Sequence, residues 1–343
     1  MSAAPTVVIP TFEARELLAE TLESLAAQTV PVRVIVVDNA SSDGTADMIS
    51  SRFPDVRVVR SARNLGFGRA INLGVAEAAA DTDAIVLVNN DAVCGPSFVE
   101  HIVAPLDDPA VGMVAGVLLQ GSAPERIDSA GVELDATLGA WDVLWNEPLE
   151  RLATAPPPVG PCGGAAAYRA QAFREVGGFD EAFFAYWEDV DLALRLRLAG
   201  WRCVAAASAR ALHRHGATLG AASPAQRRLE AFGRGYVLAR YRVGRRRPLT
   251  RLKIAALDWP VLLVHLVVRR EAAPLRARLA GRRRGLERPR LRAPLEVATV
   301  GFWTALGRQA RLVGLRVTGG LPSHFGGRSA TLDGRGTQQS DHG

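Results

Sequence analysis

Residues 6–38 read TVVIPTFEARELLAETLESLAAQTVPVRVIVVD and contain two apolar runs on either side of a helix-like segment. Thr6–Pro10 and Arg33–Asp38 are short and rich in β-branched residues, which is typical of buried strands. Between them, Glu13–Gln28 carries leucines at helical spacing. A strand, a helix and a second strand in this order indicate a unit with two parallel strands.

The same alternation continues along the chain. We expect further strands at Val56–Arg60, Ala84–Asn89, Val111–Leu119 and Trp201–Ala207, and helices from about Ala46 and over Gly68–Ala80. Residues 120–160 look irregular. Continuous apolar strands alternating with helices predict an α/β fold with a mostly parallel central sheet that is covered by helices on both faces.

The composition fits one large domain with an appendage. The chain has 343 residues, of which 48% are hydrophobic. Its three cysteines (Cys94, Cys162 and Cys203) are widely spaced, which argues for a reducing compartment and against a disulfide framework. The first residues, MSAAPTVVIP, lack the basic and long apolar regions of a signal peptide, so we expect none.

Charge is distributed unevenly along the chain. Residues 1–222 hold 16 Lys and Arg against 28 Asp and Glu, whereas residues 223–343 hold 25 against 7. This asymmetry predicts two functions in two parts. We therefore divide the chain into a catalytic domain (1–222), a basic helical extension (223–318) and a polar tail (319–343) that we expect to be disordered.

Two common nucleotide-binding motifs are absent from the sequence. No GxGxxG follows the first strand, and no GxxxxGK[ST] is found. Their absence argues against a dinucleotide-dependent dehydrogenase and a P-loop NTPase.

Polar residues instead follow the predicted strands, where open α/β sheets bind ligands. Asp38 could accept the N3–H of a uracil or thymine ring, or it could form an Asx turn. Asp91, in Asn89-Asn90-Asp91, could bind Mg²⁺ or Mn²⁺ through oxygen, or the triplet could be a polar turn. Asn64 opens a glycine-rich turn before a helix, whose N-terminal amides could approach a diphosphate.

Residues 176–201, VGGFDEAFFAYWEDVDLALRLRLAGW, concentrate acidic and aromatic side chains. Crowded carboxylates repel one another and resist desolvation, so the pattern favours a cation or a proton-transfer function. The alternative is an acidic helix start, since Asp and Glu favour that position. His213 and His215 follow in ALHRHG, and one of them could reach a metal, although a structural role is an alternative.

Taken together and in order, these segments resemble the family 2 glycosyltransferases, and most closely their bacterial rhamnosyltransferase-like branch. The likeness covers about residues 5–220. It is carried by VVIPTFEARELLAETLESLAAQ, VIVVDNASSDGT, NLGFGRAINLGV, LVNNDA, GGAAAYR, the acidic segment and ALHRHGAT.

The resemblance implies a GT-A fold and inverting transfer of a sugar from a nucleoside diphosphate to a glycan or polyprenyl-linked acceptor. It implies Asp189 as the catalytic base, with Glu188 beside it, and Asp91 and His213 as ligands of Mg²⁺ or Mn²⁺. It also implies a donor-binding set and an acceptor-binding set: Thr11, Phe12, Asp38, Asn64 and Asn90 for the donor; Gly164, Trp187 and Asp191 for the acceptor. Asp180 and Glu181 keep a structural interpretation as turn or cap residues.

Two positions depart from the family pattern. Asn89 stands at the first position of the DxD motif, a substitution common in the rhamnosyltransferase-like branch, and Glu13 stands where many relatives have Asn. The first departure favours dTDP-rhamnose as the donor. A UDP-sugar is the alternative.

The basic extension suggests where such an enzyme works. WPVLLVHLVV (259–268) is too short to span a bilayer, and arginine clusters flank it. Apolar helices beside arginines predict attachment to an anionic membrane surface, here the inner face of the cell membrane, with the enzyme in the cytoplasm. The alternatives are a solvated extension or a dimer surface, and we do not expect nucleic-acid binding because no such module is recognisable. A catalytically silent sugar-nucleotide-binding scaffold at the membrane is the rival function.

Overall fold

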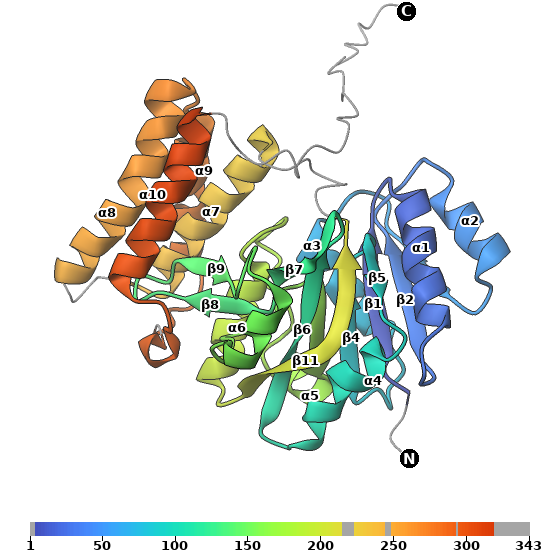
Figure 1. Ribbon diagram of the computed structural model, residues 1–343. Coiled ribbons are helices and arrows are strands. Elements are labelled where there is room, and N and C mark those ends of the chain that lie inside the picture. Colours follow the sequence, from blue (N-terminus) through green and yellow to red (C-terminus); the bar gives the residue numbers. More distant parts are fainter. Residues whose placement is uncertain (1–3, 215–222, 244–247, 293, 319–343) are drawn as a thin grey trace, which may run out of the picture.

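The computed structural model describes residues 4–214, 223–243, 248–292 and 294–318 (Figure 1). His215 and the tail that we predicted to be disordered (319–343) lie outside these residues. The strands are β1 (Thr6–Thr11), β2 (Arg33–Asp38), β3 (Arg57–Arg60), β4 (Ala84–Val88), β5 (Ala92–Cys94), β6 (Val111–Gln120), β7 (Ala123–Ser129), β8 (Val132–Leu134), β9 (Ala140–Asp142), β10 (Ala165–Arg169) and β11 (Arg202–His213).

The α-helices are α1 (Arg15–Ala26), α2 (Thr45–Arg52), α3 (Phe67–Ala76), α4 (Phe98–Val103), α5 (Ala170–Glu175), α6 (Glu188–Leu198), α7 (Pro224–Arg240), α8 (Pro248–Leu263), α9 (Ala273–Glu287) and α10 (Phe302–Thr318). Short 3₁₀ turns are η1 (Ala104–Asp107), η2 (Leu149–Thr154) and η4 (Leu295–Val297), and one π-helical turn is η3 (Val264–Val268).

The central sheet has the strand order β3-β2-β1-β4-β10-β6-β11-β5, and β7 pairs with β6 at its side. Strands β1 to β4 are mutually parallel, as the apolar runs predicted. From β10 onward the sheet is mixed, because β10 runs antiparallel to both β4 and β6. The α/β fold class is therefore confirmed, and the later strands add antiparallel pairs to it.

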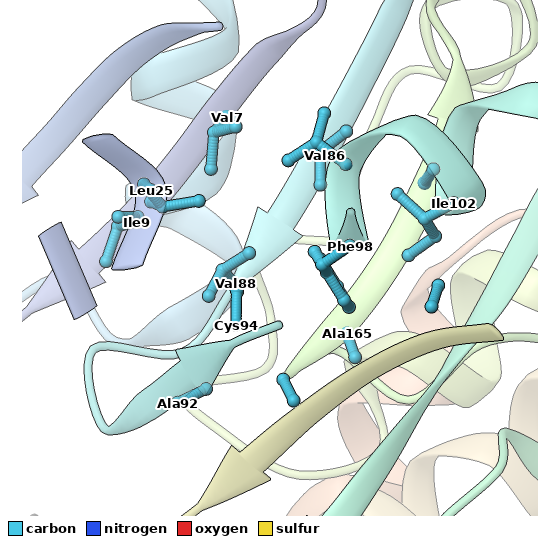
Figure 2. Close-up of a cluster of buried hydrophobic side chains, with 14 of the residues drawn as sticks. Val7, Ile9, Leu25, Val86, Val88, Ala92, Cys94, Phe98, Ile102 and Ala165 are labelled. Carbon is cyan, nitrogen blue, oxygen red and sulfur yellow. The ribbon is translucent and has the colours of Figure 1, made fainter. Parts of the chain in front are cut away.

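Both faces of the sheet are covered by helices. Alternate residues of one strand point to opposite faces, so Val7 and Ile9 enter one core while Val8 enters the other. The first core lies under α1, α2 and α4, and Figure 2 shows part of it. The second lies under α3, α5 and α6. The parallel strands are hydrophobic on both faces for this reason.

The stretch 120–160 contains more regular structure than we predicted. It forms β7, the small β8–β9 sheet and η2. The sheet of β8 and β9 lies between the central sheet and the C-terminal helices (Figure 1). The Thr299 amide donates to Leu134 O at 2.9 Å, so the C-terminal segment is joined to this sheet.

Helices α7 to α10 form the basic extension, and α7 and α9 pack closely together (Figure 1). Glycines permit this approach. A Cβ atom at Gly235 would collide with the backbone of Arg278, and one at Gly281 with the backbone of Phe232. Within the described ranges, no helix is both long enough and apolar enough to cross a membrane.

Candidate active site

Two predicted donor-binding residues lie side by side at the carboxyl ends of β1 and β2. Thr11 and Asp38 are partners in the parallel register. The Thr11 hydroxyl accepts a hydrogen bond from Asn90 Nδ2 at 3.0 Å, which brings the loop after β4 to the same edge. Three residues that are separated by up to 79 positions in sequence thus meet at one place.

The two carboxylate oxygens of Asp38 differ, because one accepts a hydrogen bond within the protein and the other does not. The side chain is fully buried, and its Oδ1 accepts from the Ser41 amide at 2.9 Å, as in an Asx turn. Its Oδ2 has no hydrogen-bond donor, although Arg60 Nε lies 3.5 Å away. A buried oxygen without a donor is unfavourable, so an N–H group from a ligand would stabilise it.

The neighbouring loop explains the unusual Glu13. Its carboxylate accepts from the Ser42 amide at 2.8 Å, and its own amide donates to Ser41 Oγ at 3.0 Å. Glu13 therefore ties the loop after β1 to the loop after β2. Phe12, which we predicted to stack on the base, is half-buried beside it.

The glycine-rich turn holds the acidic segment. Asn64 Oδ1 accepts from the Gly66 amide at 2.9 Å, and the Phe67 amide at the start of α3 donates to Phe184 O at 2.7 Å. Gly66 has a φ of 81° and no space for a Cβ atom, because the Phe184 carbonyl occupies it. One of the helix N-terminal amides that we considered for a diphosphate is thus used within the protein.

The two predicted metal ligands lie together. Asp91, after β4, and His213, at the end of β11, are both buried, and His213 Nε2 is 3.1 Å from Asp91 Oδ1. Asn89 Nδ2 is also 3.1 Å from this nitrogen. The pairing of β11 with β5 brings the histidine next to the loop after β4, because His213 is opposite Ala92.

Asp128 is a functional candidate that the sequence did not reveal. This buried residue of β7 accepts from His213 Nδ1 at 2.7 Å. Burial opposes a charge on His213, but hydrogen bonds to Asp128 and Asp91 outweigh it and raise the pKa of His213 to about 10. An acidic partner on Nδ1 fixes the orientation of the ring and directs Nε2 toward Asp91.

The side chains of Asp91 and His213 are of kinds that bind divalent cations. The 3.1 Å between His213 Nε2 and Asp91 Oδ1 is the hydrogen bond that helps to raise the pKa of His213, so a cation would take the place of the shared proton. In the described part of the chain there is no group of three or more His, Cys, Asp or Glu side chains arranged for a metal. Mg²⁺ commonly takes few protein ligands and completes its shell with substrate phosphates and water.

The predicted base lies at the start of α6. Asp189 is half-buried, and its oxygens accept from the Val190 amide at 2.7 Å and from the Gly163 amide at 3.4 Å. Burial raises the pKa of Asp189, and these amides oppose the increase. Burial and the charge of Asp189 together raise the pKa of Glu188, whose Oε2 has no hydrogen-bond partner. A carboxylate with a raised pKa is a better proton acceptor.

Two adjacent glycines connect Asp189 with the loop that carries Asp91. Gly163 donates to Asp189, and Gly164 O accepts from the Asn89 amide at 3.2 Å. A Cβ atom at Gly164 would lie 2.9 Å from Asn89 Nδ2, so a larger residue would displace that side chain. Gly164 is buried here, and its predicted contact with the acceptor stays a prediction.

Two further residues that sequence reasoning missed lie near these carboxylates. Asp142, on β9, is exposed, and the charges of Asp128 and Asp189 disfavour a further negative charge on it. The Cys162 pKa is raised by burial and by Asp142 and Asp189. The carboxylates near Asp91 and His213 and the carboxylate of Asp189 are thus close enough to influence one another's charge.

The carboxylate of Asp191 is fully buried and binds Arg240 at 2.9 Å and Arg195 at 2.8 Å. Both of its oxygens are thus engaged within the protein, and its predicted contact with the acceptor stays a prediction. Trp187 is half-buried at the start of α6, and its acceptor contact stays a prediction.

Beside the metal ligands, the described residues enclose a hollow of about 1100 Å³. It lies between α1 and the turn that joins β6 to β7, and His213 and Asp128 contribute to its wall. This space is sufficient for a ligand of the size of a saccharide.

Comparisons with known proteins point to the same kind of site. The model for "Glycosyl transferase family 2" matches residues 6–177. The N-acetylglucosaminyl-diphospho-decaprenol L-rhamnosyltransferase of Mycobacterium tuberculosis is 34% identical over 231 residues, which cover 60% of this chain and 75% of the relative. The O-antigen chain rhamnosyltransferase RfbN of Salmonella typhimurium is 27% identical over 218 residues, covering 62% and 67%.

Solved structures support the fold. A mannosyltransferase from Pyrobaculum calidifontis, in complex with GDP-Man and Mn²⁺, aligns with a TM-score of 0.53 at 18% identity over 92% of this chain and 88% of that one. GalNAc-T7 with UDP, GalNAc and Mn²⁺ aligns with a TM-score of 0.55 at 15% identity, over 75% and 50%. At these identities the likeness extends to the fold alone.

Proposed function

Because this chain belongs to glycosyltransferase family 2 and to its rhamnosyltransferase-like branch, we propose that it transfers a sugar from a nucleoside diphosphate to an acceptor hydroxyl with inversion. The arrangement of the candidate residues carries the proposal. The pair Asp91–His213 lies on one side, Asp189 on the other, and Gly163 and Gly164 form the connection between them.

Asp91 and His213 would hold the Mg²⁺ or Mn²⁺ ion, and Asp128 would orient His213. When bound, the ion would neutralise charge that develops on the departing diphosphate. Both side chains are largely buried, and His213 also lines the hollow that a ligand could enter. Low local polarity would strengthen the electrostatic contacts of the ion with Asp91 and His213.

Asp189 would act as the base. The acceptor oxygen bonds to the anomeric carbon from the face opposite the diphosphate, the carbon–oxygen bond to the diphosphate breaks, and the acceptor proton moves to a carboxylate oxygen of Asp189. The raised pKa of Asp189 suits this role. Glu188 stands next to it, and burial and the charge of Asp189 raise the pKa of Glu188, so Glu188 would stay protonated while Asp189 carries the negative charge.

The Oδ2 atom of Asp38, which accepts no hydrogen bond within the protein, supports a pyrimidine nucleotide as the donor. Uracil and thymine carry an N–H at position 3 that can donate to such an oxygen. Phe12 follows Thr11, the register partner of Asp38, and would stack on the ring. The names of two relatives point to rhamnose, so dTDP-rhamnose is the donor that we propose.

A donor screen tests this assignment. Thermal shifts with Mg²⁺ would be compared for dTDP-, UDP- and GDP-sugars, followed by transfer and donor hydrolysis before and after EDTA. We expect stabilisation by pyrimidine donors, with dTDP-rhamnose the strongest, and turnover that EDTA removes. Stabilisation by GDP-sugars alone would contradict the role of Asp38. Binding without turnover under any condition would instead indicate a silent scaffold.

A lipid-linked acceptor at the cytoplasmic face of the cell membrane is the partner that we propose. One relative is named for a decaprenol-linked substrate, and two are named for O-antigen synthesis. Among the described residues, nine of the twelve exposed large hydrophobic side chains lie between Leu249 and Trp303. Trp303 is 78% exposed and Trp259 is 53% exposed. Such side chains next to many arginines fit an anionic bilayer surface.

A further inference from the structure

The turn immediately before the proposed base has an unusual backbone. Tyr186 and Trp187 have φ values of 65° and 75°, so two consecutive residues other than glycine adopt the left-handed conformation. Trp187 also precedes α6 without any side-chain cap. Bulky residues keep such a conformation only where surrounding contacts impose it. The orientation of Glu188 and Asp189 depends on this turn because they follow it directly.

Helix α7 supplies contacts to Trp187. Gly233 lies against the tryptophan, and a Cβ atom there would be 2.6 Å from Trp187 Cβ and 2.5 Å from its Cγ. The Arg234 guanidinium lies over the indole ring, 5.8 Å from its centroid. Arg234 is itself held in place, since its Nη1 donates to Thr137 O at 2.8 Å. Trp187 is therefore enclosed by an element that begins 37 residues later in the sequence.

The same helix binds the residues on either side of the turn. Arg240 Nη1 lies 2.7 Å from Asp180 Oδ2 and 2.9 Å from Asp191 Oδ1. The Tyr236 hydroxyl donates to Asp180 at 2.5 Å, and the Tyr241 hydroxyl that follows the helix donates to Asp191 at 3.0 Å. All of these side chains are buried or nearly so. Buried hydrogen-bonded charges of this kind fix geometry strictly, because breaking one leaves another uncompensated.

We propose that α7 is a positioning element of the active site, with Gly233 and Arg240 as the positioning residues. They hold residues 180–191 at both ends and in the middle, and they thereby set the place of Asp189 relative to the metal ligands. The catalytic domain that we delimited from the sequence as 1–222 is then incomplete without the basic extension. This proposal rests on the proposed function, since it takes Asp189 as the base.

Two substitutions test the proposal in the full-length chain. Gly233→Ala introduces the Cβ atom that collides with Trp187, and Arg240→Met removes the charge between Asp180 and Asp191. The matched controls are Gly307→Ala, at a helical glycine with open space around it, and Arg228→Met, at an exposed arginine of α7. Arg240→Lys is the conservative variant. The stoichiometry of donor binding, measured calorimetrically together with the affinity, gives the fraction of folded, donor-binding enzyme in each preparation.

We expect kcat per donor-binding site to fall by about 10- to 100-fold in Gly233→Ala and Arg240→Met, since an error of about 1 Å in placing a catalytic group has effects of this size. The KM for the donor should stay within about twofold of the wild-type value. Arg240→Lys should recover part of kcat. In Arg240→Met, Asp180 and Asp191 lose the cation between them, and their negative charge should raise the pKa of the nearby Asp189. The acidic limb of the pH profile of kcat should therefore move to higher pH.

The outcomes separate this proposal from the proposed function. If Asp189→Asn retains full turnover, the base assignment fails and the positioning of that base fails with it. If Asp189→Asn is inactive but Gly233→Ala and Arg240→Met keep wild-type kcat per donor-binding site, only the positioning role of α7 is overturned. A parallel loss of donor affinity and kcat in both variants would also overturn it, since that pattern indicates general destabilisation.

Discussion

Asp189 keeps one oxygen 3.4 Å from the Gly163 amide while burial disfavours its charge. Asp38 and Asp91 are more deeply buried and stand at strand ends on the donor side. Each of these side chains has a neighbour from a remote part of the sequence, such as Arg60 for Asp38 and His213 for Asp91. At the scale of single residues, the cleft is a set of carboxylates whose environments differ enough for different functions.

The raised pKa of Asp189 leads to a prediction about pH. The base must be ionised to accept a proton, so kcat/KM should rise with pH through a pKa above the usual value of about 4. A folded-state pKa above the unfolded one gives a stabilising contribution that is complete below pH about 4 and is lost as pH rises through the folded-state value.

Asp189→Asn, which cannot ionise, should therefore raise the melting temperature at pH 7 to 9 and leave it nearly unchanged at about pH 4. The surface variant Asp55→Asn serves as the control. Calorimetric melting curves across this range provide the check. A lower melting temperature for Asp189→Asn at pH 8 would mean that burial does not disfavour the charge of Asp189.

Asp128 provides the second prediction at this scale. Asp128→Asn weakens the hydrogen bond at 2.7 Å that orients His213, and changes to such supporting partners commonly cost 10- to 100-fold in metal affinity. We expect a loss of about this size in Mn²⁺ affinity, measured by calorimetry in the presence of dTDP. Glu125→Gln, at an exposed position on the same strand, is the control. Equal affinities in the two variants would remove Asp128 from the metal site.

At the scale of elements, α3 shows how closely helices must approach the sheet. Gly74 of α3 faces β1 and β2, and a Cβ atom there would lie 2.5 Å from Val8 Cγ1 and 2.9 Å from Val37 Cγ2. Both valines are in strands that end at the predicted donor-binding residues Thr11 and Asp38. The glycine thus permits the packing that keeps the ends of β1 and β2 in place.

Gly74→Ala should destabilise the protein by about 1–3 kcal/mol, because the added methyl group overpacks a buried interface. Gly307→Ala, at a helical glycine with open space, should change stability little or increase it slightly. Urea titrations of both variants would give the two free energies of unfolding. Equal stabilities would show that α3 can shift away from the sheet without cost.

Two properties decided which elements and contacts could be predicted from the sequence: how uniformly apolar a strand is, and how far apart the contacting residues lie in the sequence. The runs that form β1, β2 and β4 were recognisable because they are buried on both faces and therefore uniformly apolar. Residues 123–142 carry mixed polar and apolar side chains, so β7 to β9 were missed, and Asp128 and Asp142 with them. The ion pair of Asp191 could not be predicted because its partner Arg240 comes 49 residues later.

At the scale of the whole molecule, the acidic and basic parts of the sequence are not independent units. Arg240 and Arg288 of the basic part bind Asp180 of the acidic part, and Arg308 binds Glu133. Part of the opposite net charge of the two parts is therefore neutralised inside the molecule. Exposed arginines and apolar side chains remain on the C-terminal helices, such as Arg282, Arg283 and Val267.

This surface should bind anionic vesicles. Replacing Trp259 and Trp303 together by alanine should weaken binding roughly tenfold or more, since burying one large apolar side chain contributes about 1.5–3 kcal/mol. Leu198→Ala, which removes an exposed apolar side chain from the end of α6, is the control. Co-sedimentation with vesicles of anionic or only zwitterionic lipid, at low and high salt, is the measurement.

We expect binding that requires anionic lipid and decreases with salt. Equal sedimentation of the double variant and the Leu198→Ala control would exclude these tryptophans from the membrane-binding surface. Failure of the wild-type chain to sediment with anionic vesicles would contradict membrane attachment itself.

The central claim is that Asp189 and the pair Asp91–His213 act on one donor from opposite sides of a single cleft. Donor affinity and turnover, measured with Mg²⁺ on the same samples of wild type and Asp189→Asn, test it most directly. The claim predicts the same donor Kd in both, turnover by the wild type that EDTA abolishes, and no measurable transfer by Asp189→Asn. Transfer by Asp189→Asn at the wild-type rate, or wild-type transfer that survives EDTA, would contradict it.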